Sequence, residues 1–140
     1  MNTETVELSL HFHGKLDYLH LATGVSRLIC KTIKELPESF VDEVELAVNE
    51  ACTNAIKHAT DADFLSRIDV RFRVYETHLV IEISDHGAGF DIESVPQPDF
   101  DQHPERGYGL YIIRTIMDEV QYTRGDGFNT LRMKKNLAKA

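Results

Sequence analysis

Residues 41–60, VDEVELAVNEACTNAIKHAT, decide the fold that we predict for this chain. At about 3.6 residues per helical turn, Glu50, Asn54 and His58 fall in one line, with Lys57 beside them. The adjoining stripe of the same helix is almost wholly apolar and contains Val44, Val48, Ala51, Cys52, Ala55, Ile56 and Ala59. One face therefore enters a core while its edge presents a carboxylate, an amide and nitrogen groups. Taken alone, such an edge is also typical of the solvated border of an amphipathic helix.

The length and composition of the chain indicate one globular domain. Its 140 residues are 42% hydrophobic and 27% charged, which is enough to bury a core without disulfides. The net charge of −8 argues against a nucleic-acid or anionic membrane surface as the main partner. The sequence shows no leader peptide and no apolar stretch of about 20 residues. Cys30 and Cys52 follow no metal or disulfide spacing, so we expect buried thiols in a cytoplasmic protein.

The pattern on either side of residues 41–60 predicts an α+β fold. Alternating apolar residues predict strands at 4–12, 67–75, 78–84, 119–124 and 128–134. Helical periodicity predicts one helix at 16–35 and another that begins near Leu110. Ser39 with Asp42 resembles a capping box at the start of the central helix. We expect an antiparallel or mixed sheet with three helices on one face.

Two segments that contain glycine flank a stretch without periodicity. Asp85 ends a strand and is followed by Gly87 and Gly89, and a carboxylate there suits an exocyclic amine such as that of adenine. Residues 106–109, RGYG, precede a helix whose first N–H groups can bind an anion. Each motif alone is also compatible with an ordinary acidic loop or a glycine-rich helix entry. The P-loop and Rossmann patterns are absent.

The ordered combination of these motifs resembles a known family. E-x-x-x-N on a helix, D-x-G-x-G-F after a strand and G-x-G-L opening a helix match the N, G1 and G2 boxes of the GHKL, or Bergerat-fold, ATPases. The pattern EACTNAIKHA, DHGAGFD, ERGYGLYIIRTIMDEVQY and NTLRMKK is most similar to the anti-sigma-factor serine kinases of the RsbW type. The resemblance covers nearly the entire chain. It implies a single domain, residues 1–140, built as a two-layer α/β sandwich with a mixed, mostly antiparallel sheet.

The resemblance also implies a set of site residues. Glu50 matches the catalytic position that orients or deprotonates the nucleophile, and Asn54 matches the position that holds Mg²⁺ against the triphosphate of ATP. Asp85 matches the carboxylate that reads adenine, Thr130 matches a hydroxyl that supports it, and residues 91–109 match the ATP lid. The other implied nucleotide-binding residues are Lys57, His58, Gly87, Gly89, Arg106, Gly107, Gly109 and Leu110. For His58, a position that simply closes the helix stays equally open.

The function implied by the resemblance is that of a serine/threonine protein kinase that uses ATP and Mg²⁺. Such a protein holds a sigma factor, phosphorylates a serine of a STAS-type anti-anti-sigma protein and works as a homodimer, without direct contact to nucleic acid or membrane. One alternative is a nucleotide-gated binding module without kinase turnover, although the presence of both Glu50 and Asn54 leans against it. The other alternative is a separate histidine-kinase catalytic domain, and in so short a chain we expect no helices that carry an acceptor histidine.

Overall fold

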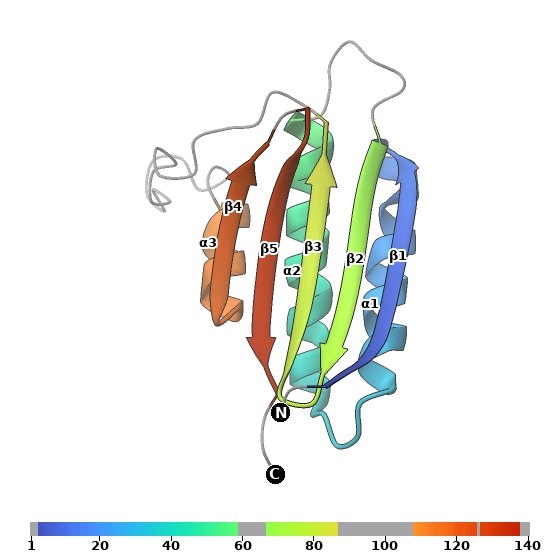
Figure 1. The fold of residues 1–140 in the computed structure, drawn as a ribbon, viewed down its shortest axis with the longest axis vertical. Helices are drawn as coiled ribbons and strands as arrows, with labels where there is room; N and C mark the ends of the chain where they lie inside the picture. The colour runs from blue at the N-terminus through green and yellow to red at the C-terminus, as the bar shows by residue number, and fades with distance from the viewer. Residues whose placement is uncertain (1–2, 59–66, 87–107, 126, 138–140) are drawn as a thin grey trace.

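The computed structural model describes residues 3–58, 67–86, 108–125 and 127–137 as one sheet with helices packed on a single face (Figure 1). The strands are β1 (Glu4–His13), β2 (Arg67–Tyr75), β3 (His78–Asp85), β4 (Glu119–Arg124) and β5 (Asn129–Asn136). The helices are α1 (Leu19–Lys31), α2 (Glu38–His58) and α3 (Tyr108–Ile116), with a short 3₁₀ turn at Leu16–Tyr18. The predicted two-layer α+β architecture is confirmed.

The five strands lie in the order β1-β2-β3-β5-β4. Every neighbouring pair in the described chain is antiparallel. The prediction allowed an antiparallel or a mixed sheet, and the described sheet is antiparallel. The predicted hairpins β2–β3 and β4–β5 are both present. Strand β3 is central, and its register against β5 places Asp85 directly opposite Asn129. The last residue of β3 and the first residue of β5 therefore lie side by side at one end of the strands.

The core lies between the sheet and the helices. On β2 the alternating residues Ile68, Val70, Phe72 and Val74 are buried, and from α2 the core receives Val44, Val48, Ala51, Cys52 and Ala55. On β1 the predicted buried face is only partly buried, since Leu8 is 38% exposed while Phe12 is buried. The difference arises because β1 is an edge strand of the described sheet. An edge strand has a neighbouring strand on one side only, so its side chains have fewer neighbours to bury them.

Two predicted helix boundaries are wrong. The helix predicted at 16–35 is divided into a 3₁₀ turn and α1, which ends at Lys31. Glu35 has a φ of 62°, which belongs to the left-handed region and cannot continue a right-handed helix. The predicted capping box at Ser39 is also wrong, because α2 already begins at Glu38. The carbonyl of Pro37 accepts hydrogen bonds from the N–H groups of Phe40 and Val41 in the first turn.

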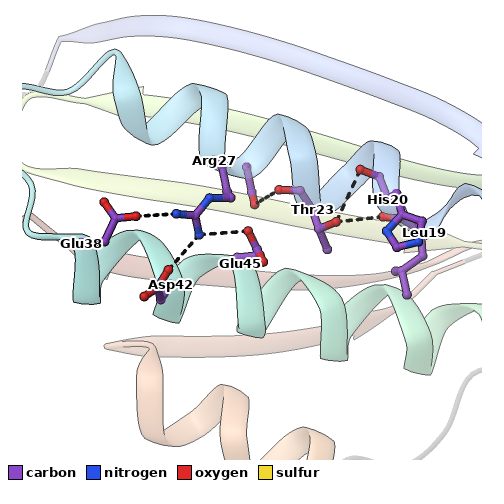
Figure 2. A network of polar contacts seen from close by, with 8 residues as sticks. Leu19, His20, Thr23, Arg27, Glu38, Asp42 and Glu45 are labelled. Carbon is purple, nitrogen blue, oxygen red and sulfur yellow. Dashed lines mark hydrogen bonds and ion pairs between the residues drawn. The ribbon is translucent and has the colours of Figure 1, made fainter.

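Helices α1 and α2 are joined by a polar network that the sequence did not reveal (Figure 2). The Arg27 guanidinium donates to Glu38 at 2.5 Å, Asp42 at 2.8 Å and Glu45 at 3.0 Å. The hydrogen bonds that Arg27 donates to Asp42 and Glu45 raise the pKa of Arg27 above its ordinary value. One cation thus lies among three carboxylates of α2, and this arrangement fixes the two helices side by side on the sheet.

The two cysteines are buried thiols, as predicted. Burial raises the pKa of Cys30 to about 11 and that of Cys52 to about 12, so both stay protonated at neutral pH. Neither thiol therefore has the low pKa of a reactive cysteine. Among the described helices, none has the length and apolar character that crossing a membrane requires.

Candidate functional site

Five of the predicted site residues, Glu50, Asn54, Asp85, Gly109 and Leu110, lie where α2, α3, β3 and β5 meet. A small cavity of about 20 Å³ lies between these elements. Its lining includes Asn54 from α2, Asp85 from β3 and Leu110 from α3. The remaining lining residues are Ala51, Ala55, Ile83, Tyr122 and Leu131. Segments far apart in the sequence therefore bring an amide and a carboxylate to one apolar hollow.

Helix α2 presents Glu50 and Asn54 one turn apart, beside the buried alanines of the same helix. The first turn of α3 lies directly against them. A Cβ atom added to Gly109 would lie 3.1 Å from Glu50 Oε2, 3.2 Å from Asn54 Nδ2 and 3.4 Å from Asn54 Oδ1. A larger residue would push these side-chain ends away by a few tenths of an ångström, so glycine suits the close approach of the α3 backbone. The E-x-x-x-N and G-x-G-L motifs, separated by more than fifty residues of sequence, are therefore in contact.

The start of α3 gives this corner a positive character. Helix α3 begins at Tyr108, in agreement with the prediction that a helix opens at residues 107–110. The first N–H groups of a helix have no partner within it and carry the positive end of the helix dipole. Gly109, in the first turn of α3, lies against Glu50 and Asn54, so this end of the helix borders the same corner. Such an arrangement can bind an anionic group such as a phosphate.

Asp85 is a buried carboxylate, 4% exposed, at the end of β3. Asn129, which is 3% exposed, donates from Nδ2 to Asp85 Oδ1 at 3.1 Å. A carboxylate buried at this depth needs hydrogen-bond donors to compensate for lost hydration. Asn129 therefore helps to keep Asp85 in place within the cavity.

The predicted role of Thr130 as the support for Asp85 stays a prediction, and the contact that the structure shows for the Thr130 hydroxyl is with Ser84. Thr130 lies opposite Ser84 in the β3–β5 ladder, and the two hydroxyl oxygens are 2.8 Å apart. Successive residues of a strand point to opposite faces, so this hydroxyl pair lies on the face of the sheet away from the helices. The preceding residue, Asn129, donates a hydrogen bond to Asp85. Sequence reasoning missed it because the register of two strands separated by a long connection is not visible in the chain.

The other predicted site residues either lie outside the small cavity or fall outside the described ranges. Lys57 is exposed near the end of α2, and it does not line the small cavity. Helix α2 ends at His58. Gly109, assigned to the lid at 91–109, belongs to the first turn of α3. The predictions for Gly87, Gly89, Arg106 and Gly107, and for residues 91–107 as a lid, lie outside the described residues.

A larger hollow of about 480 Å³ lies on the open face of the sheet. It is lined by charged and hydroxyl side chains, including His11, Asp69, Arg71 and Ser84. Of the predicted site residues that the structure describes, Thr130 alone lines it. Size alone does not identify a site, and we assign the function to the smaller cavity, because there an amide, a buried carboxylate and a helix start converge.

The donor set around Asn54 fits a cation that takes few protein ligands. Within the described ranges no group of three or more His, Cys, Asp or Glu side chains could hold a metal ion. Mg²⁺ commonly binds through one or two protein oxygens together with water and phosphate oxygens. The amide oxygen of Asn54, next to a helix start suited to phosphate, is compatible with that mode.

Comparison with known proteins gives relatives in sequence and in structure. A family model for the histidine kinase-like ATPase domain matches residues 12–135. The serine-protein kinase RsbW of Bacillus licheniformis is 40% identical over 105 residues, which cover 69% of this chain and 65% of that protein. The RsbW of Bacillus subtilis is 36% identical over 125 residues, covering 81% of this chain and 78% of that protein. The chain thus spans only 65% of the length of the first of these relatives.

Two solved structures share the fold. The RsbU and RsbW domains of a Mycobacterium tuberculosis protein match with a TM-score of 0.72 and 16% identity, over 97% of this chain and 34% of that one. The histidine kinase domain of the blue-light-activated kinase of Erythrobacter litoralis matches with a TM-score of 0.59 and 20% identity, over 86% of this chain and 60% of that one. At these identities the likeness shows the fold alone.

The pairing of Asp85 with Asn129 leads to a stability prediction. Replacing Asn129 by Ala removes a donor from a buried carboxylate, so we expect the free energy of unfolding to fall by about 1–3 kcal/mol. Urea unfolding followed by circular dichroism measures the change. The matched control is Thr130→Val, which removes a hydroxyl from the adjacent position on the open face and leaves Asp85 untouched. A loss in Thr130→Val that equals or exceeds the loss in Asn129→Ala contradicts the assignment.

Proposed function

The chain belongs to the histidine kinase-like ATPase domain family, among the RsbW serine-protein kinases, and from that premise we propose that it is a protein serine kinase that uses ATP and Mg²⁺. The observation that carries the proposal is the contact of Gly109 with Glu50 and Asn54, beside the cavity that Asp85 lines. This contact brings the groups that phosphoryl transfer needs into one corner of the fold. Phosphoryl transfer depends mainly on positioning and on the neutralisation of charge.

Each residue of the corner has a chemical part in this proposal. Asp85 accepts a hydrogen bond from the exocyclic amine of adenine, and Asn129 holds its carboxylate in place. The N–H groups at the start of α3 bind phosphate oxygens. Asn54 would hold Mg²⁺, which when bound neutralises phosphate charge and orients the triphosphate.

Glu50 is the catalytic residue in this proposal. It lies one helical turn before Asn54, with its carboxylate against the first turn of α3, on the same corner that we assign to the terminal phosphate. There it orients the serine hydroxyl of a protein substrate and accepts its proton as the hydroxyl attacks phosphorus. The bond to the ADP leaving group breaks, and the products are ADP and a phosphoserine. Two acceptor oxygens and no donor make a carboxylate suited to this task.

We further propose that the protein is an anti-sigma factor of the cytoplasm. Its substrate would be a serine of a STAS-type anti-anti-sigma protein, its other partner a sigma factor, and its working form a homodimer. These partners come from the family resemblance of the motifs around Glu50, Asp85 and Gly109. The net charge of −8 supports protein partners over nucleic acid. A paired Glu50 and Asn54 support turnover over a module that only binds nucleotide.

Substitution of Glu50 tests the proposed chemistry. We expect Glu50→Gln to bind ATP and Mg²⁺ with nearly unchanged affinity, because the amide keeps the size of the carboxylate. Transfer of labelled γ-phosphate to a purified STAS partner should fall by about 10²–10⁴-fold, the usual contribution of a general base. Full transfer by Glu50→Gln excludes this role. An acid-labile phosphoprotein from the wild type would favour the histidine-kinase alternative over a serine kinase.

The close approach of α3 to α2 gives a second prediction, with a natural control. We expect Gly109→Ala to weaken the binding of ATP and Mg²⁺ at least tenfold, because its Cβ would displace Glu50 and Asn54. Gly24→Ala adds the same methyl group to α1, where nothing lies within 4 Å of the new atom. That control should leave nucleotide binding unchanged and stabilise the fold by about 0.5–1 kcal/mol. Calorimetric titration and thermal unfolding measure both effects, and wild-type affinity in Gly109→Ala would contradict the geometry.

A further inference from the structure

We propose that Lys135 is a positioning residue for the nucleotide site. Its ammonium group fixes α3 against α2 and so holds Gly109 on Glu50 and Asn54. Lys135 itself lies at the opposite end of α3 from the site, on β5. The inference rests on the proposed function and adds to it a residue that the family motifs around Glu50 and Asn54 do not contain.

The ammonium group of Lys135 connects three elements of the fold. Nζ donates to the carbonyl oxygen of Ile116, the last residue of α3, at 2.8 Å. It also donates to Glu43 Oε2 on α2 at 3.1 Å and lies 5.0 Å from the ring centroid of Phe40. The side chain is only 12% exposed. A cation so deeply placed depends on these contacts to offset the loss of its hydration.

The chemistry of the contact suits the end of a helix. The last carbonyl groups of a helix have no partner within it and carry the negative end of the dipole. Lys135 supplies both a hydrogen bond and a positive charge to the carbonyl of Ile116. Because the donor is charged, this bond is stronger than one between neutral groups. Glu43 holds the ammonium in place from the α2 side.

The contacts of Lys135 and Gly109 lie at opposite ends of one seam between α2 and α3. On α2, Glu43 and Glu50 are about two helical turns apart, and on α3 Gly109 and Ile116 have the same separation. The two helices therefore run antiparallel, with Glu50 against Gly109 at one end and Glu43 bridged to Ile116 at the other. The contacts of Lys135 at the Ile116 end therefore limit how far α3 can move at the Gly109 end. We call these contacts the Lys135 clamp.

The site tolerates little of that movement. A Cβ atom at Gly109 would require Glu50 and Asn54 to move by a few tenths of an ångström, so a shift of α3 of that size changes the packing of both side chains. Helix α3 is also only nine residues long, and so short a helix has little stability without tertiary contacts. Its position therefore depends on anchors such as Lys135 and the buried Ile113.

The neighbouring lysine provides a matched control. Lys134 precedes Lys135 on β5 and has the same side chain, but strand alternation directs it to the open face of the sheet. There it pairs with Glu119 at 3.0 Å, and the Glu119 side chain is 51% exposed. Exposed pairs of this kind contribute little to stability. Loss of its charge leaves the seam between α2 and α3 intact.

The test measures nucleotide affinity in Lys135→Met, Lys135→Arg and Lys134→Met, each at a temperature where the variant is fully folded. Methionine keeps an apolar stem and removes the charge. We expect Lys135→Met to bind ATP and Mg²⁺ roughly tenfold more weakly, within the range by which coupling contacts change affinity. Lys134→Met should equal the wild type, and Lys135→Arg should recover most of the lost affinity. A Lys135→Met variant that melts earlier yet binds as tightly as the wild type would show a purely structural role and overturn the inference.

A second readout separates this inference from the proposed function. Amide hydrogen exchange at Gly109 and Leu110, measured without nucleotide, should quicken in Lys135→Met and stay unchanged in Lys134→Met. If the wild type binds no ATP, the proposed function fails, and the exchange experiment still decides whether Lys135 holds α3. If Lys135→Met does not fold, Glu43→Gln removes the negative charge of the half-exposed partner of Lys135. It should weaken nucleotide binding and quicken exchange at Gly109 and Leu110, by less than Lys135→Met. Unchanged exchange and affinity in that variant would count against the clamp.

Discussion

The contact of the Gly109 backbone with Glu50 and Asn54 is the constraint on which the rest of this structure depends. It fixes where α3 begins relative to α2, and therefore where a row of N–H groups meets a carboxylate and an amide. The buried alanines of α2 and the central strand β3 line the cavity next to this contact. At the far end of the same seam, Lys135 ties the last carbonyl of α3 to α2 and β5. A short helix is thus held at both ends, which is what a precise phosphate site requires.

The two faces of the sheet have different physical characters. Toward the helices, β3 and β5 present mostly apolar side chains, interrupted by the polar pair Asp85 with Asn129 and by Lys135. On the open face the same strands carry hydroxyl and charged groups, among them Ser84, Thr130 and Lys134. Because the side-chain period of a strand is two residues, a shift of one position changes the face and the function of a residue. Asn129 and Thr130 are neighbours in sequence, yet only Asn129 reaches the candidate site.

Much of this arrangement was predictable from the sequence, and the failures have physical causes. The strict alternation of β2 and the apolar stripe of α2 predicted the sheet, the core and the position of Asn54. The bond from Asn129 to Asp85 was not predicted, because strand register depends on tertiary pairing that no local pattern encodes. The capping box at Ser39 was wrong because α2 begins one residue earlier, at Glu38, which places Ser39 inside the first turn. The contacts of Arg27 and Lys135 were not predictable, since each joins elements whose relative placement the sequence does not state.

The most direct test of the account is the map of backbone amide shifts in the NMR spectrum when ATP and Mg²⁺ are added to the wild-type protein. The account requires the largest changes along α2 from Glu50 to Asn54, at Asp85 and in the first turn of α3. It requires little change at His11, Arg71 and Thr130, which line the hollow on the open face. Changes confined to that open-face hollow, or no saturable change at all, would contradict it.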